Sequence, residues 1–368
     1  MLRPKWNYNF SIITSDLKEY YYDELLEYED ILPNMSLDEV FSDFKNPFHI
    51  ISFPSLERKN ILLYCLLGHE IGHLIARKYI NESEFLKQTK DDITRIALNK
   101  LSIKEMDSIP LFREVFITEE MKIATTAWKR ALEELLSDIV GAFLFGPASL
   151  FSTFEFSMQF TMDQLPGEMN NYYPPWRLRL RKIQEIIEHP DHFLPLPNKF
   201  KFLDSTVKKV SSRYELIKEF TGNDTDLKVI NGSPLLSIVY REVDKSFITI
   251  KDKIYNELHE LEMVITPDLL YKKLPYLVER IDFEIPPNAY EPSINDREPS
   301  KLVEIINASW FHKLSWKDDI FSVEGEFNKN MISVRDKMNR LTLKAVEFAE
   351  LEGKYRDEYG KPSPYEIK

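Results

Sequence analysis

The sequence predicts an α+β fold that is predominantly α, with a small N-terminal sheet and a helix-rich C-terminal half. Glycine is scarce, with 10 residues in a chain of 368, and this disfavours a protein built from tight hairpins. The 21 prolines gather between segments whose apolar residues recur every three or four positions, which is the helical period. Two short runs near the N-terminus, Asn9–Ile13 and His49–Phe53, have instead the residue types of strands.

The first long helical segment follows Pro54. Its helical pattern continues to about Tyr79 and contains no residue that breaks it outright. Asn81 and Glu84 then resemble a capping box, the pair of side chains that satisfies the first N–H groups of a helix. This predicts a second helix that reaches about Lys100.

A third and longer helix is predicted to begin at Thr118 and to end before Gly146–Pro147. Thr118 is a favourable N-cap residue, and Glu119 and Glu120 place acidic side chains in the first turn, where the helix dipole favours them. Glycine followed by proline is a typical helix stop. Such a helix would be about 40 Å long, which is enough to cross a whole domain.

Residues 199–368 are expected to form a helical C-terminal domain after an N-terminal domain of residues 1–198. The last predicted helix carries a heptad-like stripe of apolar residues: Met331, Val334, Met338, Leu341, Ala345 and Phe348. A packing seam within the chain is the favoured interpretation of this stripe. The alternative is a face for a partner, or for self-association, through residues 331–348.

The charge balance argues against nucleic acid as a partner. The chain has 60 acidic and 48 basic residues, a net charge of −12, whereas phosphate binding needs a basic footprint. The single cysteine, Cys65, cannot form an intrachain disulfide, which fits a reducing compartment. The N-terminus lacks the apolar core of a signal peptide, and no apolar run reaches the roughly 20 residues of a membrane span. We therefore expect a cytoplasmic protein without a membrane or nucleic-acid partner.

The segment with candidate metal-binding and catalytic residues is Gly68-His69-Glu70-Ile71-Gly72-His73. Its histidines are four residues apart, so in a helix both imidazoles project from one face and can reach one zinc ion. Glu70 lies about 100° round the helix and can act as a general base on water bound to the metal. A plainer interpretation is a helix whose polar groups are satisfied by neighbours. The strongly apolar flanks count against it, because these groups are costly to bury without a partner.

A third protein ligand must come from elsewhere in the chain. The metzincin pattern would place a histidine at position 79 and a glycine at position 76, where this chain has Tyr79 and Ala76. The best candidate lies in the long helix, where Glu134 and Asp138 share a face. Buried carboxylates this close repel each other, and zinc at Glu134 together with an imidazole N–H that donates to Asp138 would offset this repulsion. Glu133 competes with Glu134, and a solvated acidic face is the alternative for the pair.

This combination resembles the gluzincin metallopeptidases, whose pattern is H-E-x-x-H with a downstream E-x-x-x-D. The resemblance covers about residues 48–181 and implies a zincin-like metallopeptidase domain. The residues that it carries over are the zinc ligands His69, His73 and Glu134, the base Glu70 and, beside a ligating imidazole, Asp138. A looser similarity links the chain to the ImmA/IrrE metallopeptidases that cleave repressors, although the helix-turn-helix of many of those proteins is not found here.

The resemblance implies a zinc-dependent peptide-bond hydrolase, an intracellular metalloendopeptidase with peptide or protein substrates. Tyr173, in the proline-rich segment after the ligand helix, is the first choice for stabilising the oxyanion, ahead of Tyr172, Arg177 and His192. Tyr173 stands where relatives are expected to have a histidine before proline. One alternative is a catalytically inactive, zinc-stabilised binding or regulatory protein. Another is a helical interaction protein that holds no metal.

Overall fold

The structure is a computed structural model of the chain. It describes residues 2–5, 11–15, 48–54, 59–82, 84–100, 110–163, 172–188, 193–194, 204–222, 233–293, 296–315 and 329–359. The chain divides into two compact units, Met1–Arg58 and Lys59–Lys368, and each is described by itself.

The first unit contains a three-stranded sheet with the strand order β1-β3-β2. Strand β1 (Leu2–Lys5) runs parallel to the central strand β3 (Phe48–Pro54), and β2 (Ser11–Ser15) pairs with β3 in the antiparallel sense. Strand β3 covers the predicted strand at residues 49–53, whereas β2 begins two residues later than predicted. The small N-terminal sheet expected from the sequence is therefore present.

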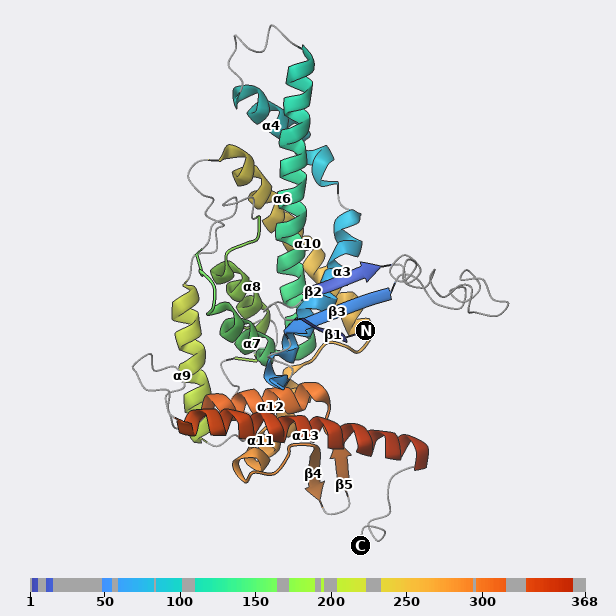
Figure 1. Cartoon of the computed structure of the whole chain (residues 1–368), viewed down its shortest axis with the longest axis vertical. Coiled ribbons are helices and arrows are strands. Elements are labelled where there is room, and N and C mark those ends of the chain that lie inside the picture. Colours follow the sequence, from blue (N-terminus) through green and yellow to red (C-terminus); the bar gives the residue numbers. More distant parts are fainter. Residues whose placement is uncertain are drawn as a thin grey trace, which may run out of the picture. The chain divides into compact units, whose positions relative to one another are not determined.

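The second unit is mainly helical, so the predominantly α character predicted from the sequence is confirmed (Figure 1). Its described elements are η3 (Ile61–Cys65), α3 (Leu66–Asn81), α4 (Phe85–Lys100), α6 (Pro110–Phe145), α7 (Pro147–Ser157), α8 (Trp176–Glu188), α9 (Asp204–Thr221), α10 (Pro234–Glu260), α11 (Pro267–Asp282), β4 (Ala289–Ser293), β5 (Asp296–Pro299), α12 (Leu302–Ser315) and α13 (Lys329–Tyr359). None of the described helices is both long and apolar enough to cross a membrane.

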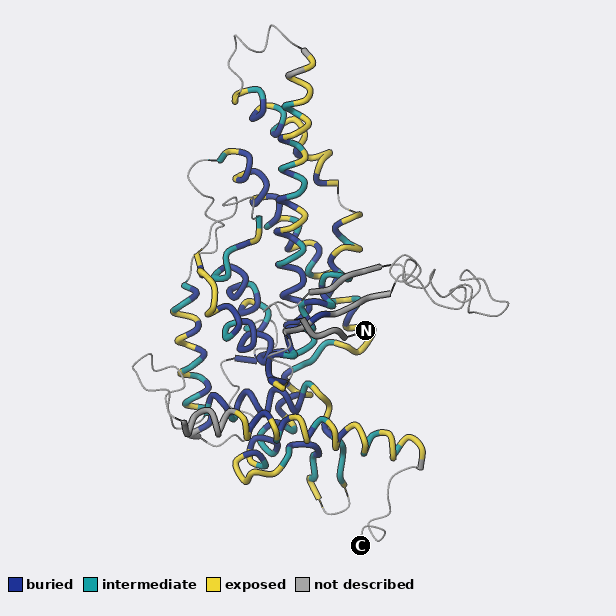
Figure 2. Tube along the Cα trace, in the orientation of Figure 1, coloured by how far each residue is buried: buried dark blue, intermediate teal, exposed yellow. Residues whose placement is uncertain are grey.

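Helix α6 organises the packing around the site. It contacts α3, α4, α8 and α10, and its second half is apolar on most sides: Leu132, Leu135, Leu136 and Ile139 are all fully buried. Figure 2 shows exposed residues near the start of α6 and buried residues along its second half. A helix covered on most sides must neutralise any charged side chain that it carries, and Glu134 lies in this stretch.

The beginning of α6 differs from the prediction. The helix starts at Pro110 and not at Thr118, and proline is well suited to a first turn because its missing N–H would be unpaired there anyway. Inside the helix, the Thr118 hydroxyl donates a hydrogen bond of 2.8 Å to the carbonyl of Glu114. The end is as predicted, because Gly146 adopts a φ of +59°, a left-handed conformation that favours glycine, and Pro147 opens α7.

A second part of the core joins α7, α8, α9, α11 and α12. Trp310 and Phe311 of α12 are fully buried there, and the Trp310 indole N–H donates to the carbonyl of Leu62 at 3.1 Å. Asn307 accepts a hydrogen bond from the backbone N–H of Ala148 and donates one to the carbonyl of Phe145. This core takes residues from both sides of position 198. The domain boundary predicted at that position lies inside the second unit and stays a prediction.

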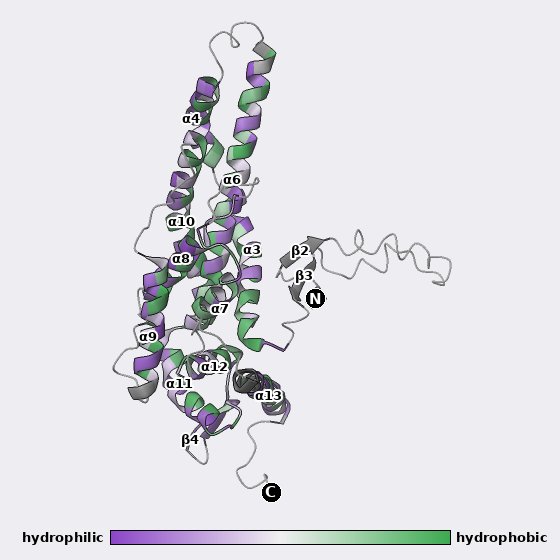
Figure 3. Ribbon diagram, turned by 60° about the vertical axis from the view of Figure 1, so that its left-hand side comes forward, coloured by the Kyte–Doolittle hydropathy of each residue, from purple (hydrophilic) through white to green (hydrophobic). Residues whose placement is uncertain are grey.

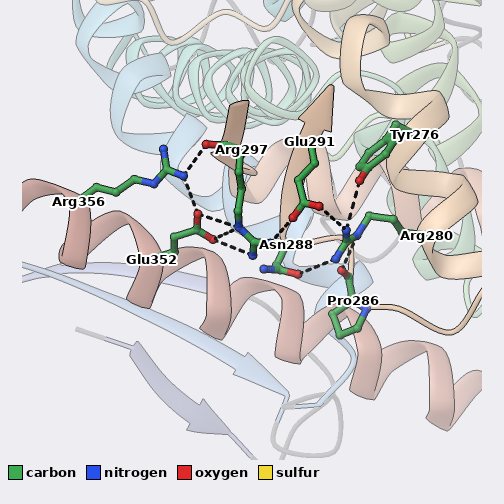
Figure 4. Close-up of polar contacts among 8 residues, drawn as sticks. All are labelled: Tyr276, Arg280, Pro286, Asn288, Glu291, Arg297, Glu352 and Arg356. Carbon is green, nitrogen blue, oxygen red and sulfur yellow. Dashed lines mark hydrogen bonds and ion pairs between the residues drawn. The ribbon is translucent and has the colours of Figure 1, made fainter. Parts of the chain in front are cut away.

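A network of ion pairs and hydrogen bonds holds the β4–β5 hairpin against α11 and α13 (Figure 4). Arg297 of β5 donates to the Glu352 carboxylate on α13 at 3.0 Å and also pairs with Glu291 of β4. Arg356 donates to the same Glu352 carboxylate at 2.8 Å. From α11, Arg280 reaches the carbonyl that precedes the hairpin, that of Pro286, at 3.1 Å. The hairpin is therefore held by charges on two helices.

Helix α13 packs on α12 through part of its apolar stripe. Met338 and Ala345 are buried, and the hydroxyls of Thr342 and Ser309 form a hydrogen bond of 2.8 Å across the two helices. Phe348 remains 47% exposed. The side chains of residues 331 and 334 lie outside the described residues. A partner or self-association face along residues 331–348 stays a prediction.

Candidate metal centre

Helices α3 and α6 approach closely because glycines face each other's backbone. A Cβ atom on Gly72 would lie 2.7 Å from both the Cα and the carbonyl oxygen of Ser137, and one on Gly68 would lie 3.2 Å from the Cα of Gly141. Position numbers rise along α3 as they fall along α6, so the two helices are antiparallel. Helix α3 carries both hydrophobic and hydrophilic segments (Figure 3). Its sequence places His69 among the hydrophilic residues.

The two imidazoles converge on one carboxylate. The Nε2 atom of His69 lies 3.6 Å from Oε2 of Glu134, and the Nε2 atom of His73 lies 3.8 Å from Oε1 of the same side chain. The ring centroids are 4.7 Å apart, with the planes nearly perpendicular. One ligand atom each of His69, Glu70 and His73 falls within 4.8 Å of the others.

These residues could hold a metal ion. A tetrahedral ion with bonds of about 2.0–2.1 Å to nitrogen and oxygen keeps its ligand atoms about 3.4 Å apart. The two separations between imidazole nitrogens and Glu134, 3.6 and 3.8 Å, exceed that value by only a few tenths of an ångström. Two imidazoles and a carboxylate suit several divalent transition metals, so the cluster does not by itself fix the identity of the ion.

The opposite nitrogen of each imidazole faces another acid of α6. The Nδ1 atom of His69 lies 2.8 Å from Oδ1 of Asp138, and Nδ1 of His73 shares a hydrogen bond of 2.9 Å with Oε1 of Glu133. A carboxylate beside Nδ1 favours the tautomer that carries its proton there, which leaves a lone pair on Nε2. Both lone pairs then face Glu134, as a metal site requires. Sequence reasoning placed Asp138 beside an imidazole but treated Glu133 only as a competitor of Glu134.

Arg179 of α8 belongs to the candidate site, and sequence reasoning did not predict it. Its Nε and Nη2 atoms donate to the two oxygens of Asp138 at 2.7 and 2.9 Å, and its Nη1 atom lies 2.9 Å from Oε2 of Glu134. The guanidinium also lies over the ring of Trp176, 4.1 Å from its centroid. Burial disfavours the charged guanidinium, but Asp138 and Glu134 outweigh this and raise the pKa of Arg179. Arg179 is therefore a fixed positive charge beside the site.

Burial and charged neighbours shift several pKa values in the site. Burial lowers the pKa of His69, but Asp138 and then Glu134 outweigh this and raise it. Burial raises the pKa of Glu70, which is only 4% exposed, and the nearby His69 and His73 partly offset that rise. Burial alone would raise the pKa of Asp138, but Arg179 and then His69 reverse this and hold it well below its usual range. Asp138 is therefore a carboxylate near neutral pH, whereas Glu70 holds a proton more readily than an exposed glutamate.

Tyr173 lies at the margin of the site. Its side chain is 45% exposed, burial of the remainder raises the pKa of its phenol, and the negative charge of Glu134 adds to this rise. Of the other candidates, Tyr172 packs into the core and its carbonyl accepts a hydrogen bond from Tyr240. The guanidinium of Arg177 is engaged by Asp163. His192 lies outside the described residues, and the role of Tyr173 as oxyanion donor stays a prediction.

A cavity of about 760 Å³ lies elsewhere, between α6, α8, α10 and the start of α11. Its walls are largely apolar, with Phe143, Ile186 and Tyr255 among them, and the two histidines are not part of its lining. It is therefore separate from the candidate metal centre.

No protein-family model, no curated protein and no solved structure matches the chain. The resemblance to gluzincin metallopeptidases consequently rests on the residues of the two motifs, and membership of that family stays a prediction.

Proposed function

We propose that this chain is a zinc-dependent peptide-bond hydrolase, a metalloendopeptidase that acts in the cytoplasm. One observation carries the proposal: the Nε2 atoms of two imidazoles converge on the Glu134 carboxylate while each Nδ1 atom faces a separate acid. Helices packed for stability alone have no need of four acids around two histidines. A cation-binding centre has that need.

His69, His73 and Glu134 would hold the ion. Zinc suits this set of two nitrogens and one carboxylate oxygen, which is the composition of several catalytic zinc sites. When bound, zinc polarises a substrate carbonyl and makes water acidic enough to serve as a nucleophile near neutral pH. Asp138 and Glu133 hold the two imidazoles with their Nε2 atoms towards Glu134.

Glu70 would move the protons. Its carboxylate takes a proton from the attacking water and passes it to the leaving amine. The raised pKa of Glu70, caused by burial, suits a group that must both accept and release a proton. The phenol of Tyr173 would donate a hydrogen bond to the oxyanion that develops on the substrate carbonyl.

The test compares the wild-type protein with Glu70→Gln. Both are loaded with zinc, their zinc content is measured, and both are incubated with a library of internally quenched peptides. We expect equal zinc content and a loss of turnover of about 10²–10⁴-fold in the variant, the usual contribution of a general base. Equal turnover by the two zinc-loaded proteins would reject Glu70 as the base.

A second candidate is a catalytically inactive protein with a zinc-stabilised fold that binds a partner. Arg179 favours an inactive centre, because its guanidinium pairs with Oε2 of Glu134 and leaves Oε1 as the oxygen of that carboxylate that could hold a metal. This candidate requires that a chelator lowers the melting temperature while no peptide is cleaved at any pH. Cleavage that the chelator abolishes would rule it out.

A further inference from the structure

A pair of arginines lies one helical turn beyond the candidate metal centre. Arg77 follows His73 by four residues on α3, and Arg130 precedes Glu134 by four residues on α6, so each shares a face with a proposed ligand. The antiparallel pairing that sets His73 beside Glu134 therefore sets Arg77 and Arg130 at the same end of the site. The turn of helix between them and the ligands corresponds to about 5.4 Å.

Both arginines are accessible. The Arg77 side chain is 45% exposed, and its Nε donates to Glu133 at 2.7 Å. That contact uses one of the five N–H donors of a guanidinium. Arg130 is exposed as well, and its charge acts on the phenol of Tyr173. The arginine pair and Tyr173 thus lie at one solvent-accessible margin of the centre.

The charges of the centre favour an anionic substrate once a metal is bound. Three guanidinium groups and four carboxylates surround it, namely Arg77, Arg130, Arg179, Glu70, Glu133, Glu134 and Asp138. With neutral imidazoles, these groups carry one net negative charge, and a divalent cation would change this to one net positive charge. The excess positive charge lies towards the margin, at Arg130, because Arg179 pairs with Asp138 and Glu134 and Arg77 pairs with Glu133.

We propose that Arg77 and Arg130 bind a carboxylate of the peptide substrate, so that the enzyme prefers peptides with an acidic group beside the bond that it cleaves. Guanidinium groups bind carboxylates through paired, charge-assisted hydrogen bonds. An extended peptide advances about 3.3 Å per residue, so a group one helical turn away is one or two residues from the scissile bond. The carboxylate is that of an acidic side chain or of the peptide C-terminus. This inference rests on the proposed hydrolase function and names its substrate class.

The test uses four fluorescent peptides of one core sequence, which carry Glu or Gln two residues after the cleaved bond and end in a free carboxylate or an amide. Binding to zinc-loaded Glu70→Gln protein is followed by anisotropy, and hydrolysis by zinc-loaded wild-type protein is followed by kcat/KM. We expect at least one carboxylate, internal or terminal, to improve binding and kcat/KM about tenfold. The peptide that shows this gain identifies which carboxylate is bound.

The substitution Arg130→Gln is made in the wild-type protein and in the Glu70→Gln protein. It should reduce the preference for the carboxylate to less than twofold, through a higher KM in the first and weaker binding in the second. Lys129→Gln is the matched control, since it removes an equal charge from an exposed neighbour on a different face of α6. Arg77→Lys is the third variant, because it keeps a positive charge near Glu133 but removes the guanidinium group. An undiminished preference in Arg130→Gln, or an equal loss in Lys129→Gln, overturns the inference.

The two proposals can fail separately. If no peptide is cleaved but Arg130 still governs carboxylate-dependent binding, the hydrolase fails and the arginine site stands. If peptides are cleaved without regard to their carboxylates, the hydrolase stands and the arginine site fails.

Discussion

The close contact of α3 and α6 makes Gly72→Ala the most informative perturbation of the site. Any side chain at position 72 puts a Cβ atom 2.7 Å from the backbone of Ser137, whereas ordinary contacts begin near 3.4 Å. Backbone atoms in the middle of a buried helix cannot turn aside as the end of a side chain can. The helices must therefore separate by about 0.7 Å to admit the methyl group.

That displacement has two measurable consequences. Alanine favours a helix interior over glycine by about 1 kcal/mol, and overpacking costs about 1–3 kcal/mol, so the net loss of stability is about 0–2 kcal/mol. The separations between the imidazole nitrogens and Glu134, now 3.6 and 3.8 Å, would open to about 4.3–4.5 Å if α3 moved as a rigid body. This is well beyond the spacing of about 3.4 Å in a tetrahedral site, so zinc affinity should fall at least tenfold.

The control is Gly353→Ala in α13, where no atom lies within 4 Å of the added Cβ. Here only the helix preference acts, and we expect a gain of up to about 1 kcal/mol with unchanged zinc affinity. The two variants are compared by urea unfolding and by competition for zinc with a chromophoric chelator. The reasoning is refuted if Gly72→Ala is stabilised as much as Gly353→Ala and binds zinc as tightly as the wild-type protein.

Three further expectations follow from the contacts of the site and core. Glu133→Gln removes the carboxylate that holds His73 but keeps a side chain of the same shape, so chelator competition should show zinc binding weakened about 10–100-fold with little change in unfolding free energy. Arg179→Met leaves Asp138 buried without its guanidinium and should cost about 3–5 kcal/mol in urea unfolding, whereas a loss below 1 kcal/mol would show that the buried pair is not needed. Burial raises the pKa of Cys65 to about 12, so at pH 8 only about one thiol in 10⁴ is ionised, and a disulfide reagent should label the native protein far more slowly than the protein in urea.

The sequence was sufficient to predict which face of α3 and which face of α6 carry the residues of the candidate site. His69 and His73 are fixed by the helical period, and Glu134 and Asp138 repeat the same four-residue spacing on a partner helix. The start of α6 was misplaced because Thr118 is a good N-cap residue by type, yet its hydroxyl bonds back to the preceding turn of a helix already formed. A local preference of this kind is readily overridden when the packing of a long helix continues through it.

The contacts of Arg179 and Glu133 in the site could not be predicted from the sequence, for a different reason. Arg179 lies 41 residues after its partner Asp138, on a helix whose rotation is set by packing against α6, and nothing in the local sequence distinguishes it from Arg177 or Arg181. Glu133 stands beside Glu134 on α6, so its neighbour on α3 depends on how the two helices are rotated against each other. The glycines at positions 68, 72 and 141 determine how closely α3 and α6 approach each other. That role depends on the positions of both backbones, which the local sequence does not give.

Close packing also explains why the site needs cations at all. Glycines bring α3 and α6 together, and that contact shields the acids of α6 from water, so each acid needs a compensating charge. Arg179 neutralises Asp138 and shares Glu134, and Arg77 pairs with Glu133. Glu70 and Glu134 then face the two imidazoles, and Arg179 neutralises the charge of Glu134 only in part. Two protonated imidazoles or one divalent cation would balance what is left, and only the cation leaves both Nε2 lone pairs directed at a common point. The geometry that shields the acids therefore also turns both Nε2 atoms towards Glu134, an arrangement in which one divalent cation could be held.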